Sequence, residues 1–167
     1  MKWNKIPYPA IKKIEVLSDI LAVPKTVATL LAQRGIEDFE AAKRFFRPDL
    51  SHLYDPFQMQ DMIIAVNRIQ GAIEGKEGVM VFGDYDVDGT TSVALVASYL
   101  KNKISYLNTY IPDRYSEGYG ISIKGIEDAK TEGITLIIAL DCGIKAIEQV
   151  AYAKSLGIDF IICDHHL

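Results

Sequence analysis

The chain has 167 residues and a net charge of −4 at pH 7, and 49% of its residues are hydrophobic and 24% charged. This composition excludes an intrinsically disordered chain and fits one ordinary globular domain with a small N-terminal appendage. The acidic balance argues against indiscriminate nucleic-acid binding. The charge is uneven, however, because residues 1–50 hold nine of the 18 Lys and Arg but only six of the 22 Asp and Glu. Two divalent cations bound among the later acids would offset four negative charges.

We expect neither a membrane span nor a signal peptide. The longest apolar runs, such as residues 134–140, are far too short to cross a bilayer. Residues 1–10 contain two prolines and no long apolar core, which is not the pattern of a signal peptide. Cys142 and Cys163 are the only cysteines and give no disulfide framework, so we expect a reducing, cytoplasmic compartment.

Residues 1–57 are predicted to form a helical and irregular region. Apolar residues recur at helical spacing from Leu17 to Leu31, with an interruption at Pro24. A second short helix is predicted over residues 39–46. Prolines with polar neighbours then mark a loop that separates this region from the rest of the chain.

Residues 58–167 are expected to form an α/β domain. An amphipathic helix is predicted over residues 62–73. Short strands then alternate with helices of about ten residues, which indicates right-handed crossover connections and a parallel β-sheet flanked by helices. The strands are predicted at residues 79–82, 106–111, 134–140 and 160–163, and the helices after Gly89 and at residues 122–131 and 145–155.

Three acidic motifs follow predicted strands. The carboxyl ends of parallel strands lie along one edge of a sheet, where ligands bind, so residues far apart in the sequence are expected to converge there. The motifs are Asp84-Tyr85-Asp86-Val87-Asp88-Gly89, Asp141-Cys142-Gly143 and Asp164-His165-His166.

The first motif is expected to bind a hard divalent cation. Its three carboxylates alternate over residues 84–88, and crowding them without a cation would be electrostatically costly. Gly89 permits a tight turn, and a helix that starts at Thr90 and Thr91 is expected to offer free N–H groups to an anion. A solvated acidic turn is the plain alternative. A calcium loop of the EF-hand type is another, but Leu95 at its twelfth position cannot supply the required carboxylate.

The second motif leaves two interpretations open. Asp141 either binds a cation or caps a helix that begins near Ile144, and the two roles are compatible. Cys142 has no histidine or other base in a matching pattern. It is therefore expected to be a small buried packing residue and not a nucleophile.

The third motif places two adjacent histidines beside Asp164. A lone histidine such as His52 is expected at the surface or in a structural role, but a pair after an apolar strand is harder to explain by packing. The apolar strand also argues against the remnant of an expression tag. Imidazole suits manganese and other transition ions, and a carboxylate can orient the ring through its second nitrogen. Carboxylates and imidazoles without a set of thiolates predict a two-metal hydrolase of phosphate esters.

Taken together, the three motifs resemble motifs I, II and III of the DHH phosphoesterases. Within that family, further segments resemble the RecJ-type exonucleases, and the resemblance covers nearly the whole chain. These segments are Leu31-Ala32-Gln33-Arg34-Gly35-Ile36, Phe45-Phe46-Arg47-Pro48, Ile111-Pro112-Asp113-Arg114 and Glu117-Gly118-Tyr119-Gly120.

The resemblance implies 5′ to 3′ degradation of single-stranded DNA to mononucleotides in recombination and repair, with manganese or magnesium as cofactor. It also implies a single-strand-binding protein and a helicase as partners. By position, His166 would contact or orient the scissile phosphate and Asp164 would support the adjacent ring. Arg114 is a further candidate for a phosphate contact, with a solvent-exposed loop arginine as its plain alternative. The implied ligands of two metal ions are Asp84, Asp86, Asp88, Asp141 as the bridging ligand, and His165.

Two departures from the family pattern affect these expectations. Many relatives carry histidine at the position of Phe82, and phenylalanine cannot bind a metal, so more of the binding falls to Asp84. The sequence also ends directly after the third motif, without the fourth motif and its metal-binding aspartate. We therefore expect a fragment that is incomplete as a catalyst. The alternatives are a DHH phosphodiesterase acting on short oligoribonucleotides, cyclic dinucleotides or pyrophosphate, and a non-catalytic nucleic-acid-binding scaffold.

Overall fold

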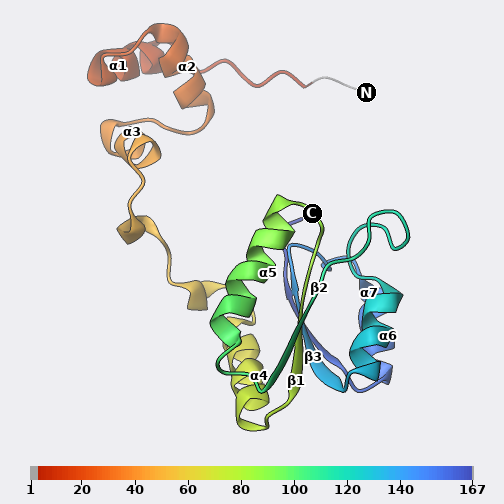
Figure 1. Cartoon of the computed structure of the whole chain (residues 1–167). Coiled ribbons are helices and arrows are strands. Elements are labelled where there is room, and N and C mark those ends of the chain that lie inside the picture. The colour runs from red at the N-terminus through yellow and green to blue at the C-terminus, as the bar shows by residue number, and fades with distance from the viewer. Residues whose placement is uncertain (1–3, 167) are drawn as a thin grey trace. The chain divides into compact units, whose positions relative to one another are not determined.

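The structure is a computed structural model that describes residues 4–166, so residues 1–3 and 167 of the two predicted regions lie outside it. The chain divides into two compact units, Met1–Gln58 and Met59–Leu167. Figure 1 labels α1 to α7 and β1 to β3, which are numbered in chain order. Within the described residues, no helix is long and apolar enough to cross a membrane.

The first unit is helical, as predicted. Instead of one interrupted helix, it has two, because the chain turns at Ala22 with a φ of 52° and restarts after Pro24. Asp38 caps the third helix by accepting a hydrogen bond from the N–H of Ala41 at 2.7 Å. The elements are α1 (Ile11–Leu21), α2 (Lys25–Gln33), α3 (Phe39–Phe46) and the short 3-10 helices η1 (Leu50–His52) and η2 (Pro56–Gln58).

A small apolar core holds the three helices of this unit together. Its fully buried centre is Leu17 of α1, and Ala28 and Leu31 of α2 pack against it. His52 has the structural role expected for a lone histidine, because its Nδ1 accepts a hydrogen bond from the N–H of Asp49 at 3.2 Å.

The second unit is an α/β domain with a four-stranded parallel sheet in the order β2-β1-β3-β4. The predicted fold class is therefore confirmed. The strands are β1 (Gly78–Gly83), β2 (Tyr106–Tyr110), β3 (Ile134–Leu140) and β4 (Asp159–Cys163), and the helices are α4 (Met62–Glu74), α5 (Val87–Leu100), α6 (Ile123–Thr131) and α7 (Ile147–Ser155).

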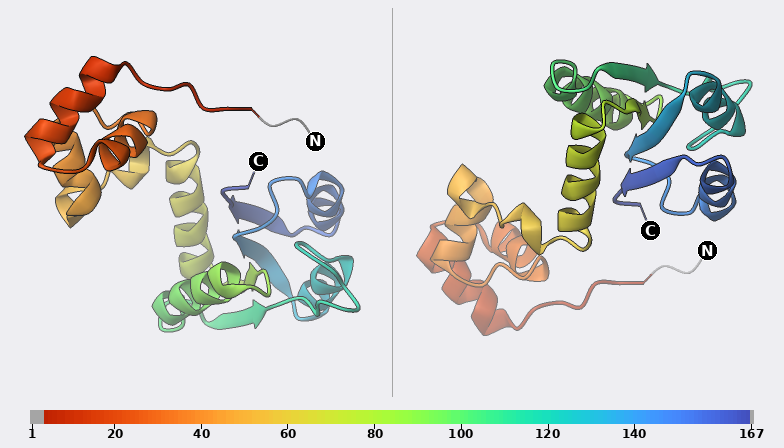
Figure 2. Two further views of the ribbon diagram at one scale, coloured as in Figure 1. Left: turned by 90° about the horizontal axis from the view of Figure 1, so that it is seen from above. Right: turned by 90° about the horizontal axis from the view of Figure 1, so that it is seen from below.

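Alternating side chains of the central strands build two cores, one on each face of the sheet. Val79 and Val81 of β1 are fully buried in the core that includes residues of α4 and α5. Met80 and Phe82 of the same strand point the other way, into the core that includes residues of α6 and α7. Both views in Figure 2 show these helix pairs on opposite faces of the sheet. The two buried faces explain why the strands are continuous apolar runs.

The strand order creates a point where the chain changes direction across the sheet. From β1 the chain crosses to β2 on one side, and after β2 it returns to β3 on the other side of β1. In open parallel sheets, ligands bind at the carboxyl ends of the strands next to such a point. The loops after β1 and β3 lie there.

Candidate metal centre

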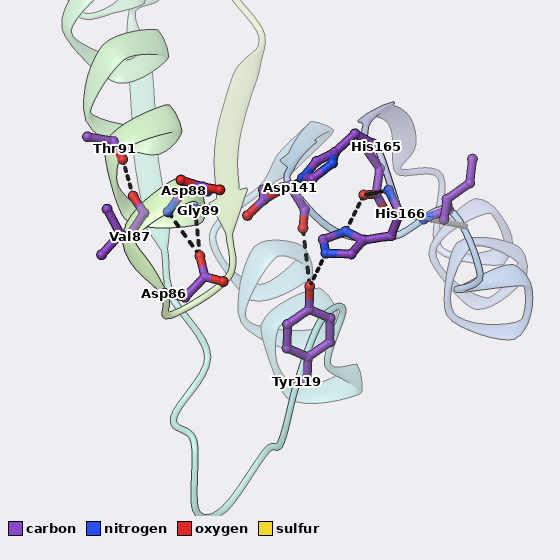
Figure 3. Close-up of polar contacts among 11 residues, drawn as sticks. Asp86, Val87, Asp88, Gly89, Thr91, Tyr119, Asp141, His165 and His166 are labelled. Atoms are coloured by element: carbon purple, nitrogen blue, oxygen red, sulfur yellow. Dashed lines mark hydrogen bonds and ion pairs between the residues drawn. The ribbon is translucent and has the colours of Figure 1, made fainter. Parts of the chain in front are cut away.

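Strand register brings the three acidic motifs together. Gly83 at the end of β1 pairs with Leu140 at the end of β3, and Leu140 pairs with Cys163 at the end of β4. The next residue after each of these strand ends is an aspartate. The convergence predicted from the strand ends is therefore what the fold produces, and Figure 3 shows residues of all three motifs facing one region.

Asp84 is the most unusual side chain of this edge. It is fully buried, and among the described residues neither of its carboxylate oxygens has a hydrogen-bond partner. A buried carboxylate without a partner carries a large desolvation cost, which in proteins is normally offset by hydrogen bonds, an opposite charge or a metal ion. Two buried oxygens without a partner, at the strand end beside Asp141, fit a cation ligand.

Two glycines allow the backbone around Asp84 to pack this tightly. A Cβ atom on Gly89 would lie 2.4 Å from the carbonyl oxygen of Asp84, and a Cβ on Gly83 would lie 2.3 Å from a methyl carbon of Val93. Any larger residue at these two positions would separate the end of β1 from the start of α5. The glycine of the first motif is therefore required by close approach of the backbone.

Asp86 is exposed and serves as the N-cap of α5. Its Oδ1 accepts hydrogen bonds from the N–H groups of Asp88 and Gly89, both at 3.0 Å. Asp88 is exposed in the first turn of the helix, where the helix dipole favours a negative charge. Both side chains can still present an oxygen to a cation, but one oxygen of Asp86 also stabilises the helix (Figure 3).

The prediction of an anion site at Thr90 and Thr91 is wrong. Helix α5 begins at Val87, about one turn earlier than predicted, because Asp86 caps it. The N–H of Thr90 donates to the carbonyl of Asp86 at 3.0 Å, and its hydroxyl donates to the same carbonyl at 2.7 Å. The hydroxyl of Thr91 donates to the carbonyl of Val87.

Asp141 follows β3 in a left-handed backbone conformation, with a φ of 61°. Its N–H donates to the carbonyl of Cys163 at 2.8 Å, which fixes this conformation against β4. Its side chain is only 6% exposed, and Oδ1 lies 2.9 Å from Nε2 of His165. The alternative role of Asp141 as a helix cap is wrong, because α7 begins only at Ile147.

Asp164 is the best-satisfied acid of the edge. Its Oδ2 accepts a hydrogen bond from the N–H of Ile144 at 2.9 Å, and its Oδ1 accepts from the N–H of His166 at 3.0 Å. The same Oδ1 is 2.7 Å from Nδ1 of His166. Burial alone would raise the pKa of Asp164, but hydrogen bonds from Ile144, His166 and His165 outweigh it and lower the pKa to about 2. In turn, the hydrogen bond to Asp164 raises the pKa of His166.

Asp141, His165 and His166 form a group suited to a metal ion. One donor atom from each lies within 4.8 Å of the others, and the two imidazole rings are 4.6 Å apart between centroids. Asp84, Asp86 and Asp88 fall outside this group at that spacing. The three aspartates of the first motif follow β1, which pairs with β3, so they lie at the neighbouring strand end.

Tyr119 is a site residue that the sequence pattern indicated only as part of a family segment. Its hydroxyl lies 3.3 Å from Nε2 of His166 and donates to the carbonyl of Asp141 at 3.5 Å. Burial and the negative charges of Asp84, Asp141 and Asp86 raise its pKa, so the hydroxyl keeps its proton. The signal in the sequence was the glycine on each side of Tyr119, both with a φ above 80°.

Arg114 lies on an exposed loop, as the alternative to a phosphate contact predicted, but it also contacts Tyr85 of the first motif. Its guanidinium carbon is 5.3 Å from the centre of the Tyr85 ring, which is a cation–π distance. The ring of Tyr85 in turn meets the ring of Tyr119 edge-on at 6.0 Å. The loop after β2 therefore supplies both an aromatic and a cationic side chain to the site.

Two further residues next to the motifs belong to the core. Phe82 is fully buried and stacks on Tyr110 with ring centroids 5.1 Å apart. Cys142 is 1% exposed, as expected for a packing residue. Burial and the nearby charges of Asp84, Asp164 and Asp141 raise the pKa of its thiol to about 12, so it is no nucleophile at neutral pH.

A cavity of about 580 Å³ opens beside the third motif. This volume is within the range of pockets that hold small ligands. Its lining combines acids, imidazole and a lysine with backbone, and includes Asp86, Tyr119, Gly143, Lys145, Asp164 and His166.

Known proteins are similar to this chain in sequence and in fold. Residues 78–167 match the DHH family, N-terminal domain. The single-stranded-DNA-specific exonuclease RecJ of Bacillus subtilis is 40% identical over 166 residues, which cover 99% of this chain and 21% of that protein. RecJ of Escherichia coli is 31% identical over 159 residues, which cover 93% of this chain and 27% of that protein. The chain thus spans only about a quarter of the length of these curated relatives.

Solved structures show the same architecture. A crystal structure of exonuclease RecJ bound to manganese matches with a TM-score of 0.57 and 29% identity, over 62% of this chain and 27% of that chain. RecJ in complex with Mn2+ from Thermus thermophilus matches with a TM-score of 0.67 and 22% identity, over 96% of this chain and 22% of that chain. The second likeness shows the fold alone. Since the family match covers more than half of the sequence and all three motifs, this chain belongs to the DHH family.

Proposed function

We propose that this chain is part of a metal-dependent exonuclease that hydrolyses phosphodiester bonds in single-stranded DNA from the 5′ end. The observation that carries the proposal is the buried, unpartnered carboxylate of Asp84 next to the group of Asp141, His165 and His166. The curated relatives are single-stranded-DNA-specific exonucleases, and relatives have been crystallised with manganese and magnesium. The longer protein, and not this chain alone, is proposed to be active.

The proposed cofactors are two divalent ions, Mn2+ or Mg2+. Carboxylate oxygens and imidazole nitrogens are donors that Mn2+ accepts, and Asp84 has two oxygens without another partner among the described residues. When bound, such ions polarise a phosphoryl oxygen and activate water at neutral pH. Asp141, nearly buried at the strand end between the other two motifs, is proposed as the ligand that both ions share. The proposed ligand set is Asp84, Asp86, Asp88, Asp141 and His165.

His166 is proposed to contact the scissile phosphate. Asp164 engages Nδ1 of this ring at 2.7 Å and thereby fixes its orientation. Nε2 then faces the hydroxyl of Tyr119 beside the cavity, where it can donate a hydrogen bond to a phosphate oxygen. Asp164 is thus proposed to act through the ring of His166. Arg114 is proposed as a further phosphate contact, supported by its place over Tyr85.

The same proposal extends to partners and compartment. An enzyme of this kind needs exposed single strands, which a helicase generates and a single-strand-binding protein covers. We propose both as partners, in the cytoplasm and in the recombination and repair of DNA. A non-catalytic scaffold has no need for the unpartnered Asp84, whose burial is costly without a cation.

A nuclease assay of the full-length protein tests the proposal. With Mn2+ and a 5′-phosphorylated single strand, Asp86→Ala is expected to lower kcat/KM by at least ~100-fold, since loss of a metal ligand costs several kcal/mol of transition-state stabilisation. Asp38→Ala is a matched control, because Asp38 also caps a helix but lies before α3, in the first unit. Unchanged degradation by Asp86→Ala would contradict the site. Faster cleavage of dinucleotides than of long strands would instead favour the small-substrate alternative.

A further inference from the structure

The segment between β2 and α6, residues 111–121, carries Tyr119 and Arg114 to the candidate site. This segment contains no helix or strand, and its backbone forms a turn in which the N–H groups of Glu117 and Gly118 donate to the carbonyl of Asp113. Glu117 lies in its middle and is not among the residues that line the cavity. Its side chain is nonetheless only 6% exposed.

The carboxylate of Glu117 receives donors from both ends of the segment. Its Oε2 accepts hydrogen bonds from the hydroxyls of Tyr110 and Ser122, each at 2.6 Å. Its Oε1 accepts from the N–H of Asp113 at 3.0 Å and lies 3.8 Å from the ammonium group of Lys124. Tyr110 ends β2, and Ser122 is the N-cap of α6. One carboxylate therefore ties the last strand residue, the start of the segment and the cap of the next helix.

Each donor is itself fixed by the fold. The ring of Tyr110 stacks on the buried Phe82, and burial together with the hydrogen bond to Glu117 raises its pKa to about 12, so its hydroxyl remains a donor. The hydroxyl of Ser122 accepts from the N–H of Gly125 at 3.0 Å while it donates to Glu117. Burial alone would raise the pKa of Glu117, but its donors together lower it, which keeps the group ionised.

The position of Tyr119 follows from this arrangement. Only Gly118 separates it from Glu117, and Gly118 and Gly120 have φ values of 84° and 83°, which few other residues adopt. Two flanking glycines give the backbone freedom that must be removed before the hydroxyl of Tyr119 can face His166. Charge-assisted hydrogen bonds to the adjacent Glu117 restrain this freedom and tie the segment to β2 and α6.

We propose that Glu117 is a positioning residue that fixes segment 111–121 so that Tyr119 and Arg114 line the substrate side of the site. This inference rests on the proposed function and adds to it a residue that touches neither metal nor substrate. Loss of the carboxylate leaves the sheet and the acidic motifs in place and frees the segment. Substrate binding then weakens while metal binding does not.

Hydrogen exchange of this chain tests the structural half of the proposal. In Glu117→Ala, exchange over residues 111–121 is expected to rise at least ~10-fold, while peptides of β1 and β3 keep their protection. Glu117→Gln, which still has an oxygen to accept from the hydroxyl pair, is expected to restore most of this protection. Tyr110→Phe removes one donor only and is expected to raise exchange by about threefold. This variant tests the proposal if Glu117→Ala does not fold.

A matched pair of controls lies at the other end of the same strand. Glu132 accepts a hydrogen bond from the hydroxyl of Tyr106 at 3.2 Å, as Glu117 does from Tyr110. Glu132→Gln and Tyr106→Phe are expected to leave exchange over residues 111–121 unchanged. Unchanged exchange in Glu117→Ala, or an equal rise in β1 and β3, would overturn the proposal.

Kinetics of the full-length protein test the functional half. Glu117→Ala is expected to raise KM for single-stranded DNA at least ~10-fold with a smaller change in kcat, and to leave Mn2+ affinity within about twofold. A fall in Mn2+ affinity, or an unchanged KM, contradicts the positioning role. If the unaltered full-length protein degrades no DNA, the proposed function fails, but the exchange experiment still decides whether Glu117 fixes the segment.

Discussion

The two edges of the parallel sheet hold Glu77 and Asp84 in opposite ways. At the amino ends of the strands, Arg68 of α4 donates to Glu77 and to Asp159, both at 2.7 Å, and Thr135 also donates to Glu77. At the carboxyl ends, Asp84 has no partner among the described residues. The fold can therefore give two acids at strand ends a charged partner with a single arginine. Where it leaves one buried and unpaired, we infer a requirement for a cation.

The largest effect is expected when the unpaired acid is removed. Mn2+ at about 100 times its Kd is expected to stabilise the unaltered chain by about 2.7 kcal/mol, and Asp84→Asn is expected to abolish this gain. Urea unfolding with and without Mn2+ measures both. Without metal, Asp84→Asn should be at least as stable as the unaltered chain, because it removes an uncompensated buried charge.

Glu77→Gln is the matched control for this experiment, since it alters an acid that already has partners at the opposite edge. It should keep the full stabilisation by Mn2+. Equal Mn2+ stabilisation of Asp84→Asn and the unaltered chain would contradict the inference that Asp84 binds the cation.

A smaller effect is expected at the paired edge. Arg68→Met removes the shared donor and should lower the free energy of unfolding by about 1–2 kcal/mol, since the side chains of Arg68 and Glu77 are 25% and 28% exposed and their interaction is partly screened. The same urea experiment measures this loss. Lys25→Met is the control, because the pair of Lys25 and Glu15 is well exposed and should contribute less than Arg68 does. A larger loss in the control would contradict the assignment.

The smallest effect concerns pH. Hydrogen bonds from Arg68 and Thr135 lower the pKa of Glu77 below its ordinary value of 4.5. Because the folded-state pKa is depressed, this contribution to stability is present above pH 4.5 and disappears as the pH falls through the folded-state pKa. The stability difference between the unaltered chain and Glu77→Gln should therefore shrink from about pH 6 to about pH 3.5. If the stability difference between the two proteins grew as the pH fell, the assigned direction of the pKa shift of Glu77 would be contradicted.

The parts of the fold that were predictable from the sequence are those with two buried faces. The runs of residues 79–82 and 134–140 are strands because their side chains fill both cores, and the observed strands Gly78–Gly83 and Ile134–Leu140 match them within one residue. Helix starts were less predictable. A pattern of alternating acids does not reveal that the side chain of Asp86 caps α5 and so starts the helix at Val87.

The candidate site was predictable in its outline and not in its contacts. Strand ends in a parallel sheet must meet, so the meeting of the three motifs follows from topology. The partner of each acid depends on contacts across the fold. The N–H of Ile144, near the start of the helix that Asp141 was one candidate to cap, donates instead to Asp164, twenty residues after Ile144. The contacts of Tyr119 to Asp141 and His166 were not predictable, because they join loops far apart in the sequence, although the glycines on either side marked its position.

The order of the motifs along the chain has a consequence for biosynthesis. Asp84 follows the first strand to leave the ribosome, whereas His165 and His166 follow the last, and the register that aligns them exists only after β3 has paired with both β1 and β4. During synthesis, Asp84 therefore stays hydrated until the sheet closes around it. The proposed cation-binding group can form only after β1, β3 and β4 have paired, so Mn2+ binding would report the assembly of these three strands.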